Sequence, residues 1–337
     1  MDQKIDRGVY KNRHECLHNI ASHHARTRSL RRQIFKQKVS FNREEENRTK
    51  KTENKLTITI IGAAGTAGST VTDRLLKRNY DLLFCEKGEG TARLQERGLT
   101  VTNIEEAVPK SDIVIMTVPD AKIGEISKHI VPTMKTDRTM ILLDPAAAYI
   151  GELALRDDCS FVIAHPCHPA LFAEQDTPEA RQDFFGGIAK QDIVIALLQG
   201  KEENFRKAEE ICIEIFSPIA KCHRITVDQM TTLEPIAAEV VAASAAYLMK
   251  EAFDEAVKHG VPEEAARSFM LGHTRIILAI FFGTTSHQIS DAAKVAIQYG
   301  YNRIFKPDWK EMFESGEMKE IVHEMLHPEE AQEWKMK

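Results

Sequence analysis

Three glycines that directly follow an apolar, β-branched run limit the fold more than any other part of this sequence. The run spans residues 56–61, and the glycines are Gly62, Gly65 and Gly68. In such a pattern the first glycine allows a tight exit from a strand, the second lets the backbone approach a pyrophosphate, and the third permits close packing of a helix. The free N–H groups at the start of that helix also favour a phosphate. The segment therefore predicts a dinucleotide-binding βαβ unit.

The rest of this unit is expected as an amphipathic helix at about 66–78 and a strand at 80–85. Glu86 follows the strand, where an acid can bind the ribose hydroxyls of the cofactor. Its charge would repel a 2′-phosphate, so NAD is favoured over NADP, although the adjacent Lys87 acts against this preference. The predicted cofactor contacts in this unit are Gly62, Ala64, Gly65, Thr66, Ala67, Gly68 and Glu86.

Strand and helix patterns alternate beyond this unit. Buried strands are expected at 111–120 and 139–148, with a helix at about 121–130 between them. Ligands bind at the carboxyl ends of the strands in an open parallel sheet, so the loops there should line the nicotinamide half of the site. Four more residues are therefore expected at the cofactor: Val118, Pro119, Asp120 and Asp144.

The C-terminal part has a different character. After one more βαβ pattern at 191–228, helical periodicity dominates from about 230 to 325. An alanine-rich run at 231–260 is too long and too apolar for a surface helix, and we expect it to form the spine of a helical domain and a homodimer interface. The sequence thus predicts an α/β Rossmann-like NAD-binding domain followed by an all-α C-terminal domain with a long central helix.

The charge distribution separates the start of the chain from the rest. Residues 1–55 contain 15 Lys and Arg against 7 Asp and Glu, whereas the whole chain carries −5. We expect 1–54 to be a basic, disordered extension. It has no zinc-ligand spacing and no recognisable reader motif, so nucleic acid is not an expected partner. The predicted domains are then 55–228 for the dinucleotide and 229–330 for the substrate and dimerisation.

Composition limits the environment in which the chain works. No apolar run approaches the ~20 residues that a membrane span requires, and no apolar secretory segment follows the N-terminus. The six cysteines form no CxxC pair and are expected as reduced thiols. These features predict a cytoplasmic protein without a membrane partner.

The segment "HPCHP" at 165–169 follows an apolar run expected to be a strand at 161–164. Removal of a hydride from an alcohol needs a base or a Lewis acid at the hydroxyl, so His165 is a candidate metal ligand or base and His168 a candidate catalytic group. A structural histidine is the alternative for both. In an extended segment His165 and Cys167 point to one side and His168 to the other. Cys167 is therefore a candidate ligand or a buried thiol.

A second metal ligand is expected from the helical domain. Glu234 precedes Pro235 in the first turn of the long helix, so its carboxylate should lie near the rim of the cofactor cleft as the partner of His165. The alternative is an acid favoured by the helix dipole alone. Glu239 is a further candidate, but five residues along an α-helix correspond to about 140°, so the two acids should not share one target. His, Glu and Cys ligands favour zinc, whereas magnesium or manganese would favour carboxylates.

Four motifs carry a resemblance to a known family: "GAAGTAG", "HPCHPALF", "LEPIAAE" and "GHTRIILAIFFG". Together they resemble the 6-phosphogluconate dehydrogenase-like superfamily, and within it the bacterial group with a phosphogluconate-dehydrogenase-type C-terminal domain that includes the D-apionate oxidoisomerases. The resemblance covers roughly residues 56–325. It implies a metal-assisted, NAD-dependent oxidoreductase that acts on a polyhydroxy carboxylate, a sugar acid. The long helix departs from the better-known relatives, because Lys250 is followed by "EAFD", and this argues against decarboxylation of the 6-phosphogluconate type.

Three further interpretations stay open. The resemblance makes His273 a candidate substrate contact, with Arg275 as a possible carboxylate clamp, although a histidine in so apolar a helix can also be a core residue. Within enzymes, the HP-x-x-P element also looks like prephenate dehydrogenase. In another class, the chain could be an NAD-sensing regulator that binds the cofactor without turnover.

Overall fold

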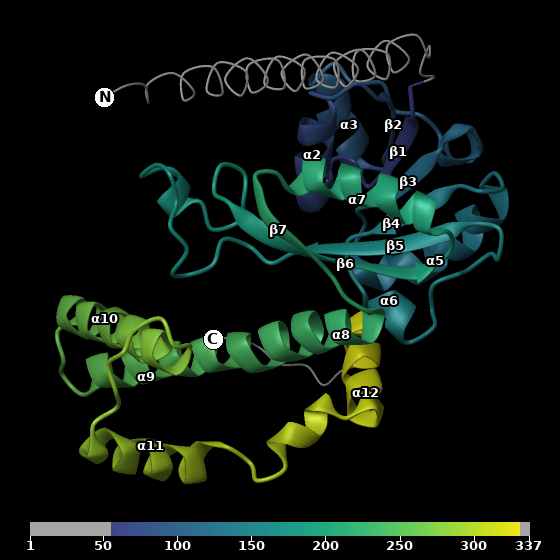
Figure 1. Cartoon of the computed structure of the whole chain (residues 1–337). Helices are drawn as coiled ribbons and strands as arrows, with labels where there is room; N and C mark the ends of the chain where they lie inside the picture. The colour runs from purple at the N-terminus through teal and green to yellow at the C-terminus, as the bar shows by residue number, and fades with distance from the viewer. Residues whose placement is uncertain (1–54, 331–337) are drawn as a thin grey trace, which may run out of the picture. The chain divides into compact units, whose positions relative to one another are not determined.

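The computed structural model describes residues 55–330 (Figure 1). The extension predicted to be disordered, 1–54, lies outside the described residues. From Lys55 onward the chain forms one unit. A division of this unit between residues 228 and 229 stays a prediction.

Seven strands form a single sheet in the order β2-β1-β3-β4-β5-β6-β7. Their bounds are β1 Thr57–Ile61, β2 Asp81–Cys85, β3 Ile113–Met116, β4 Thr139–Leu142, β5 Ser160–Pro166, β6 Gln191–Gln199 and β7 Ile219–Arg224. The first five strands are parallel, β6 runs antiparallel to β5, and β7 is parallel to β6. The antiparallel step was not anticipated from the sequence. Strands β3 and β4 end before Pro119 and Pro145, earlier than predicted, because proline cannot donate to a ladder.

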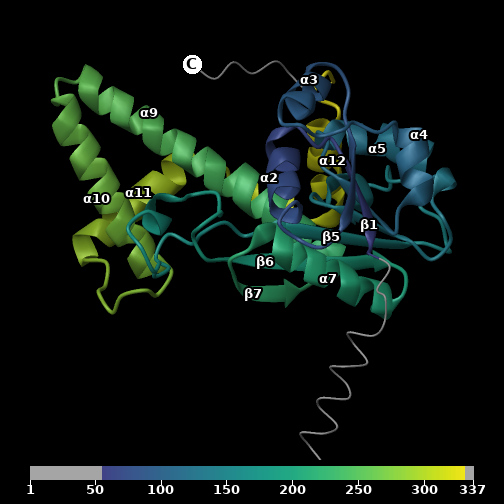
Figure 2. The same ribbon diagram turned by 90° about the horizontal axis from the view of Figure 1, so that it is seen from above.

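Helices cover both faces of the sheet (Figures 1 and 2). In the nucleotide-binding part they are α2 Thr66–Leu75, α3 Glu89–Glu96, α4 Ile104–Ala107, α5 Asp120–Ile130, α6 Ala146–Tyr149 and α7 Glu202–Phe216. Short 3₁₀ turns lie at Val108–Lys110, Val131–Thr133 and Ala180–Gln182. One apolar cluster packs α2, α3 and α7 on the sheet, and the other packs α5 and α6 on its opposite face. The sheet is therefore buried on both sides, as a Rossmann-like fold requires.

The C-terminal part is helical and begins with one continuous helix, Val227–Lys258. The elements are α8 Val227–Thr231, the π-helical segment η4 Thr232–Ala243, α9 Ser244–Lys258, α10 Glu263–Phe281, α11 Asp291–Ile304, a 3₁₀ turn at Trp309–Phe313 and α12 Ser315–Leu326. Helix α10 packs against α9, whereas α12 returns to α5 and α6. Its side chains Met318, Val322 and Leu326 are buried there. The predicted order of a Rossmann-like part followed by helices with a long central one is confirmed.

The long helix is apolar and largely exposed. By length and composition it could cross a membrane, with a mean hydropathy of 1.2 over its most apolar window, although no run of membrane-spanning length was expected from the sequence. One such helix is weak evidence for a membrane, because interface helices have the same composition. Only 11% of its most apolar window is buried in the described unit.

Candidate active site

The glycine loop has the shape that its sequence predicts. Gly62 adopts φ +84°, and a Cβ at this position would lie 2.8 Å from the carbonyl oxygen of Thr117. A Cβ on Gly68 would overlap the carbonyl oxygen of Gly62, so the fold itself requires both glycines. Gly65 is different, because the nearest neighbour of its Cβ would be 3.4 Å away. Its missing side chain therefore leaves room for a ligand at the start of α2, where no side chain caps the helix.

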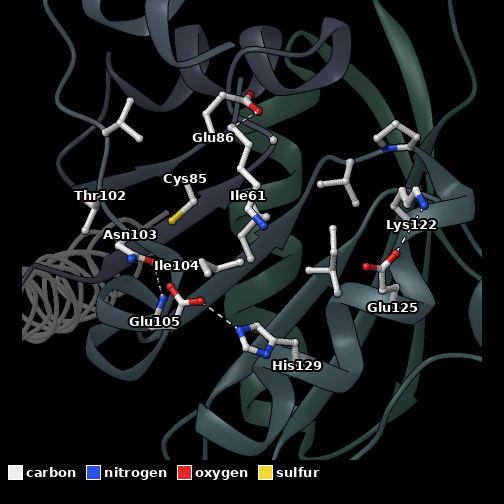
Figure 3. Close-up of a pocket in the computed structure, with 16 residues that line it drawn as sticks. Ile61, Cys85, Glu86, Thr102, Asn103, Ile104, Glu105, Lys122, Glu125 and His129 are labelled. Carbon is white, nitrogen blue, oxygen red and sulfur yellow. Dashed lines mark hydrogen bonds and ion pairs between the residues drawn. The ribbon is translucent and has the colours of Figure 1, made fainter. Parts of the chain in front are cut away.

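Glu86 lies beside this loop, at the end of β2. Its Oε2 accepts a hydrogen bond of 2.7 Å from the N–H of Ala64, and its Oε1 accepts one from Lys87. A pocket of about 880 Å³ opens next to it and is also lined by Gly62, Val118 and Pro119 (Figure 3). The loop, the acid and the pocket together fit the adenosine half of a dinucleotide.

A second group of side chains lies at the ends of the next two strands. Asp144 follows β4, His165 belongs to the end of β5, and Glu234 comes from η4. One ligand atom from each of these residues lies within 4.8 Å of the others. The structure thus brings His165 and Glu234 together, with Asp144 beside them, whereas their binding of a metal stays a prediction.

His165 is held in one protonation state by its surroundings. Its Nδ1 lies 2.8 Å from the carbonyl oxygen of Leu143. A carbonyl only accepts, so Nδ1 carries the proton and Nε2 keeps its lone pair. Burial lowers the pKa of His165, and the nearby His168 lowers it further. The ring is therefore neutral near pH 7 and can bind a cation or accept a proton through Nε2.

The two carboxyl groups share a buried, negatively charged environment. Asp144 Oδ1 accepts a hydrogen bond of 2.7 Å from the N–H of Ala146. Burial raises the pKa of Asp144, and the charge of Asp120 adds to this effect. Burial also raises the pKa of Glu234, and the charges of Asp144 and Glu239 raise it further. The pair therefore retains a proton at neutral pH.

One oxygen in this cluster lacks a partner. Among the described residues, Oε2 of Glu234 is a buried side-chain atom without a hydrogen bond. A buried carboxylate oxygen without a partner is costly, so its position suggests a ligand. Two carboxylates and the free Nε2 of His165 are suitable donors for a divalent cation.

The π-helical segment changes the geometry predicted for Glu239. The i→i+5 hydrogen bonds of this segment wind the chain more loosely than an α-helix, which narrows the angle between side chains five residues apart. The charge of Glu239 accordingly raises the pKa of Glu234. Pro235 lies inside this segment and cannot donate a backbone hydrogen bond, which favours the irregular winding. Glu234 belongs to the ligand group with Asp144 and His165, whereas Glu239 is exposed and lies outside it, so the expectation that the two acids do not share one target stays a prediction.

Family models match both parts of the chain. Residues 52–171 match the acetohydroxy acid isomeroreductase, NADPH-binding domain, and residues 173–326 match the phosphogluconate dehydrogenase (decarboxylating) C-terminal domain. The resemblance to the 6-phosphogluconate dehydrogenase-like superfamily is confirmed.

Curated relatives give a narrower result. The D-apionate oxidoisomerase of Blautia hydrogenotrophica is 42% identical, with 82% of this chain and 99% of the relative covered. That of Cupriavidus necator is 41% identical, with 79% and 97% covered. This chain belongs to the D-apionate oxidoisomerase family.

A solved structure agrees with this family assignment. A semialdehyde dehydrogenase NAD-binding protein from Cupriavidus necator, crystallised with calcium and NAD, is 41% identical with a TM-score of 0.78 and covers 80% of this chain and 99% of its own. Family membership and the glycine loop with Glu86 make the chain an NAD-dependent oxidoreductase, like other members of the D-apionate oxidoisomerase family. The prediction of an enzyme is confirmed.

Other predicted residues lie apart from this cluster or at its edge. His168 adopts φ +57°, which turns the chain so that its ring meets the ring of His165 edge-on, with centroids 6.4 Å apart. The prediction that the two rings point to opposite sides was therefore wrong, because the segment is not extended at His168. Cys167 is exposed rather than buried and does not belong to the ligand group of Asp144, His165 and Glu234.

The residues predicted from α10 also lie elsewhere. His273 is exposed, its Nδ1 lies 3.0 Å from the carbonyl oxygen of Phe269, and its ring stacks on that of Phe269. Arg275 lines a second pocket together with the loop from Pro169 to Phe184. Neither His273 nor Arg275 is a core side chain within the described unit, and the role of His273 stays a prediction.

Two features of the D-apionate oxidoisomerase site were missed from the sequence. Asp144 was assigned to the cofactor, although its position directly before the short helix α6 could have indicated a residue whose carboxylate is oriented by a backbone N–H. The π-helical winding gives almost no sequence signal besides Pro235.

Proposed function

We propose that this chain oxidises D-apionate with NAD while a hydroxymethyl group migrates between adjacent carbons, giving 3-oxo-isoapionate, NADH and a proton. The observation that carries the proposal is the buried cluster of Asp144, His165 and Glu234 at the edge of the sheet that also carries the cofactor loop. Oxidation and a carbon shift both require neighbouring oxygens of the substrate to be held away from water, and this cluster provides donors for that purpose.

Asp144, His165 and Glu234 would hold a divalent cation. The fit rests on the buried Oε2 of Glu234, which has no partner in the described unit, and on the free Nε2 of His165. A bound cation would supply Lewis acidity to neighbouring substrate oxygens. The related Cupriavidus necator structure contains calcium, and two carboxylates suit calcium, magnesium or manganese, whereas the imidazole suits the zinc favoured from the sequence.

Glu239 would accept the proton that the substrate hydroxyl loses. It lies on η4 five residues after Glu234, with part of its surface exposed, and partial burial of its carboxyl group together with the charge of Asp120 raises its pKa. A carboxylate with a raised pKa is a better base near neutral pH than an ordinary one. His165 would then act as a ligand and not as the base.

Matched variants separate these two roles. We expect Glu239→Gln to lower kcat while the cation content of the purified enzyme stays unchanged, and His165→Ala to lower both. If His165→Ala kept its cation and lost only turnover, His165 would be the base and the assignment of Glu239 would fall.

A substrate panel tests the function itself. NADH formation at 340 nm would be measured with D-apionate, other aldonates and prephenate, and the product would be identified by mass and NMR. We expect turnover with D-apionate and a rearranged carbon skeleton in the product. Turnover with prephenate alone, or NAD binding without any turnover, would contradict the proposal.

The cation is tested by metal analysis and add-back. Enzyme purified without chelators should contain a stoichiometric divalent metal, chelation should abolish NADH formation, and single metals restored one at a time should identify the active one. Full activity in a chelated, metal-free sample would show that no cation is needed.

A homodimer is the third part of the proposal. Large apolar side chains are exposed along the C-terminal helices: Phe269, Leu271, Ile276, Ile277, Phe281, Phe282, Val295, Ile297, Ile304 and Phe305. Helices α9 and α11 have no buried residue in the described unit. So large an apolar surface supports a second copy of the chain as its cover. Light scattering coupled to gel filtration should give twice the mass of 38.1 kDa without detergent. A cytoplasmic location is part of the same proposal, tested by fractionation of cells.

A further inference from the structure

A second group of possible ligands lies where α12 returns to the sheet. His323 lies in the last turn of α12, and His327 is the residue that caps the C-terminal end of this helix. Their rings are tilted by 34° with centroids 4.4 Å apart. Glu152, in the loop after α6, reaches the same place, and one ligand atom from each of the three lies within 4.8 Å of the others.

The surrounding structure fixes these side chains. The buried residues Val322 and Leu326 each directly precede one of the two histidines, so packing of α12 against α5 and α6 also sets the position of the pair. Gly124 of α5 lies directly beside Glu152, because a Cβ on Gly124 would lie 3.3 Å from the backbone carbonyl oxygen of Glu152. The three groups thus come together through the fold and not through a flexible loop alone.

We propose that Glu152, His323 and His327 form a second metal site, for a divalent transition metal such as zinc, that ties α12 to the nucleotide-binding part. Two imidazoles and one carboxylate are a ligand set that suits zinc, nickel or copper better than magnesium or calcium. A fourth coordination position of the metal would be open to solvent, since His323 is exposed. This site is separate from the cluster of Asp144, His165 and Glu234 and does not depend on the proposed reaction.

Binding would replace a proton by a metal. His327 Nε2 lies 2.8 Å from Glu152 Oε1, an ion pair when the ring is protonated. The metal would take the place of the proton on Nε2, so that the carboxylate and the ring become neighbouring ligands and the proton goes to solvent. The other ring nitrogen of His327 faces Glu329 at 3.7 Å, which helps to orient the ring.

The test uses the full chain without a histidine tag and with Glu234→Gln, so that the first cluster cannot bind strongly. Zinc is titrated in a calorimeter, and cobalt is titrated with detection of its visible absorption bands. We expect one zinc per chain, a higher Tm with zinc, and cobalt bands typical of nitrogen and oxygen ligands.

His323→Ala is the decisive variant. It removes one ligand from an exposed position and leaves the pair of Glu152 and His327 intact. We expect zinc affinity to fall by more than about 100-fold, beyond the ~10–100-fold that loss of a residue supporting a ligand costs. His259→Ala, on the exposed end of α9, is the matched control and should titrate like its parent. Equal zinc affinity in His323→Ala and its parent, or no zinc binding in the parent, would overturn the proposal.

Discussion

Two clusters of histidine and carboxylate flank the short helix α6, and they differ in exposure and in the pairing of their charges. These differences indicate different functions. Asp144 precedes α6 and meets Glu234, whereas Glu152 follows α6 and meets His327. In the first cluster Asp144 is buried, His165 and Glu234 are half-buried, and Oε2 of Glu234 has no partner among the described residues. In the second cluster His323 is exposed, whereas Glu152 and His327 are about one third exposed and already paired with each other. Burial makes the first cluster costly to maintain, which is expected of a catalytic site, whereas the second can only add a modest link between elements.

The largest effect should come from breaking the buried cluster. Glu234→Gln removes one charged ligand while it keeps the size of the side chain, so we expect NADH formation with the substrate to fall by about 10²–10⁴-fold. Glu251→Gln, an exposed acid on α9, is the matched control and should keep full activity. Steady-state kinetics of NADH formation by both variants test this prediction. A fully active Glu234→Gln enzyme would show that this cluster takes no part in the reaction.

The attachment of α12 should depend on its apolar side chains more than on the second cluster. Leu326 is only 3% exposed, so Leu326→Ala should lower the free energy of unfolding by about 2–5 kcal/mol. The neighbouring Met325, which is 37% exposed, provides the control. Met325→Ala should change the free energy of unfolding by less than about 0.5 kcal/mol. Denaturant unfolding followed by circular dichroism gives both values. Equal effects of the two variants would mean that α12 is not packed as described.

The sequence predicted some parts of the site and missed others, and the difference has a physical cause. The glycine loop and Glu86 depend on residues close together in the chain, so spacing alone located them. His165 and Glu234 were found because strand ends and helix starts meet at one edge of such a sheet. The place of Asp144 beside His165 and Glu234 was missed, since the side on which a carboxylate points after a strand depends on the next turn, here the N–H of Ala146, and its contact with the cofactor stays a prediction.

Two other differences have longer-range causes. Strand β6 runs antiparallel to β5 although its apolar sequence is equally compatible with a parallel strand. The π-helical winding of Thr232–Ala243 is a property of hydrogen bonds over five residues, which helix propensity does not encode. The histidine pair at 323 and 327 had a visible spacing, but its carboxylate partner, Glu152, is far away in sequence.

The pH dependence of cation binding should sharpen the contrast. Burial raises the pKa of Glu234, so the cation-free cluster keeps a proton that a cation must displace. Affinity should therefore rise with pH, by at most about tenfold per unit for each proton released, until the raised pKa of Glu234 is passed. Calorimetry with calcium at about pH 6, 7 and 8 measures this slope, and Glu234→Gln should reduce it. An affinity that is constant or falls with pH would contradict the protonated pair.

The smallest effect is expected at the second cluster in zinc-free protein. The hydrogen bond from His327 to Glu152 raises the pKa of His327, so this pair stabilises the fold below the ordinary pKa of histidine, and the stabilisation is lost as pH rises through the raised value. Glu152→Gln should lower Tm by less than about 3 °C at pH ~5.5 and by still less at pH ~8.5, because the pair is screened by solvent. Glu320→Gln, an exposed acid on the same helix, should leave Tm unchanged at both values. A larger loss at the higher pH would mean that Glu152 acts through packing and not through charge, and the contrast between the two clusters would then rest on burial alone.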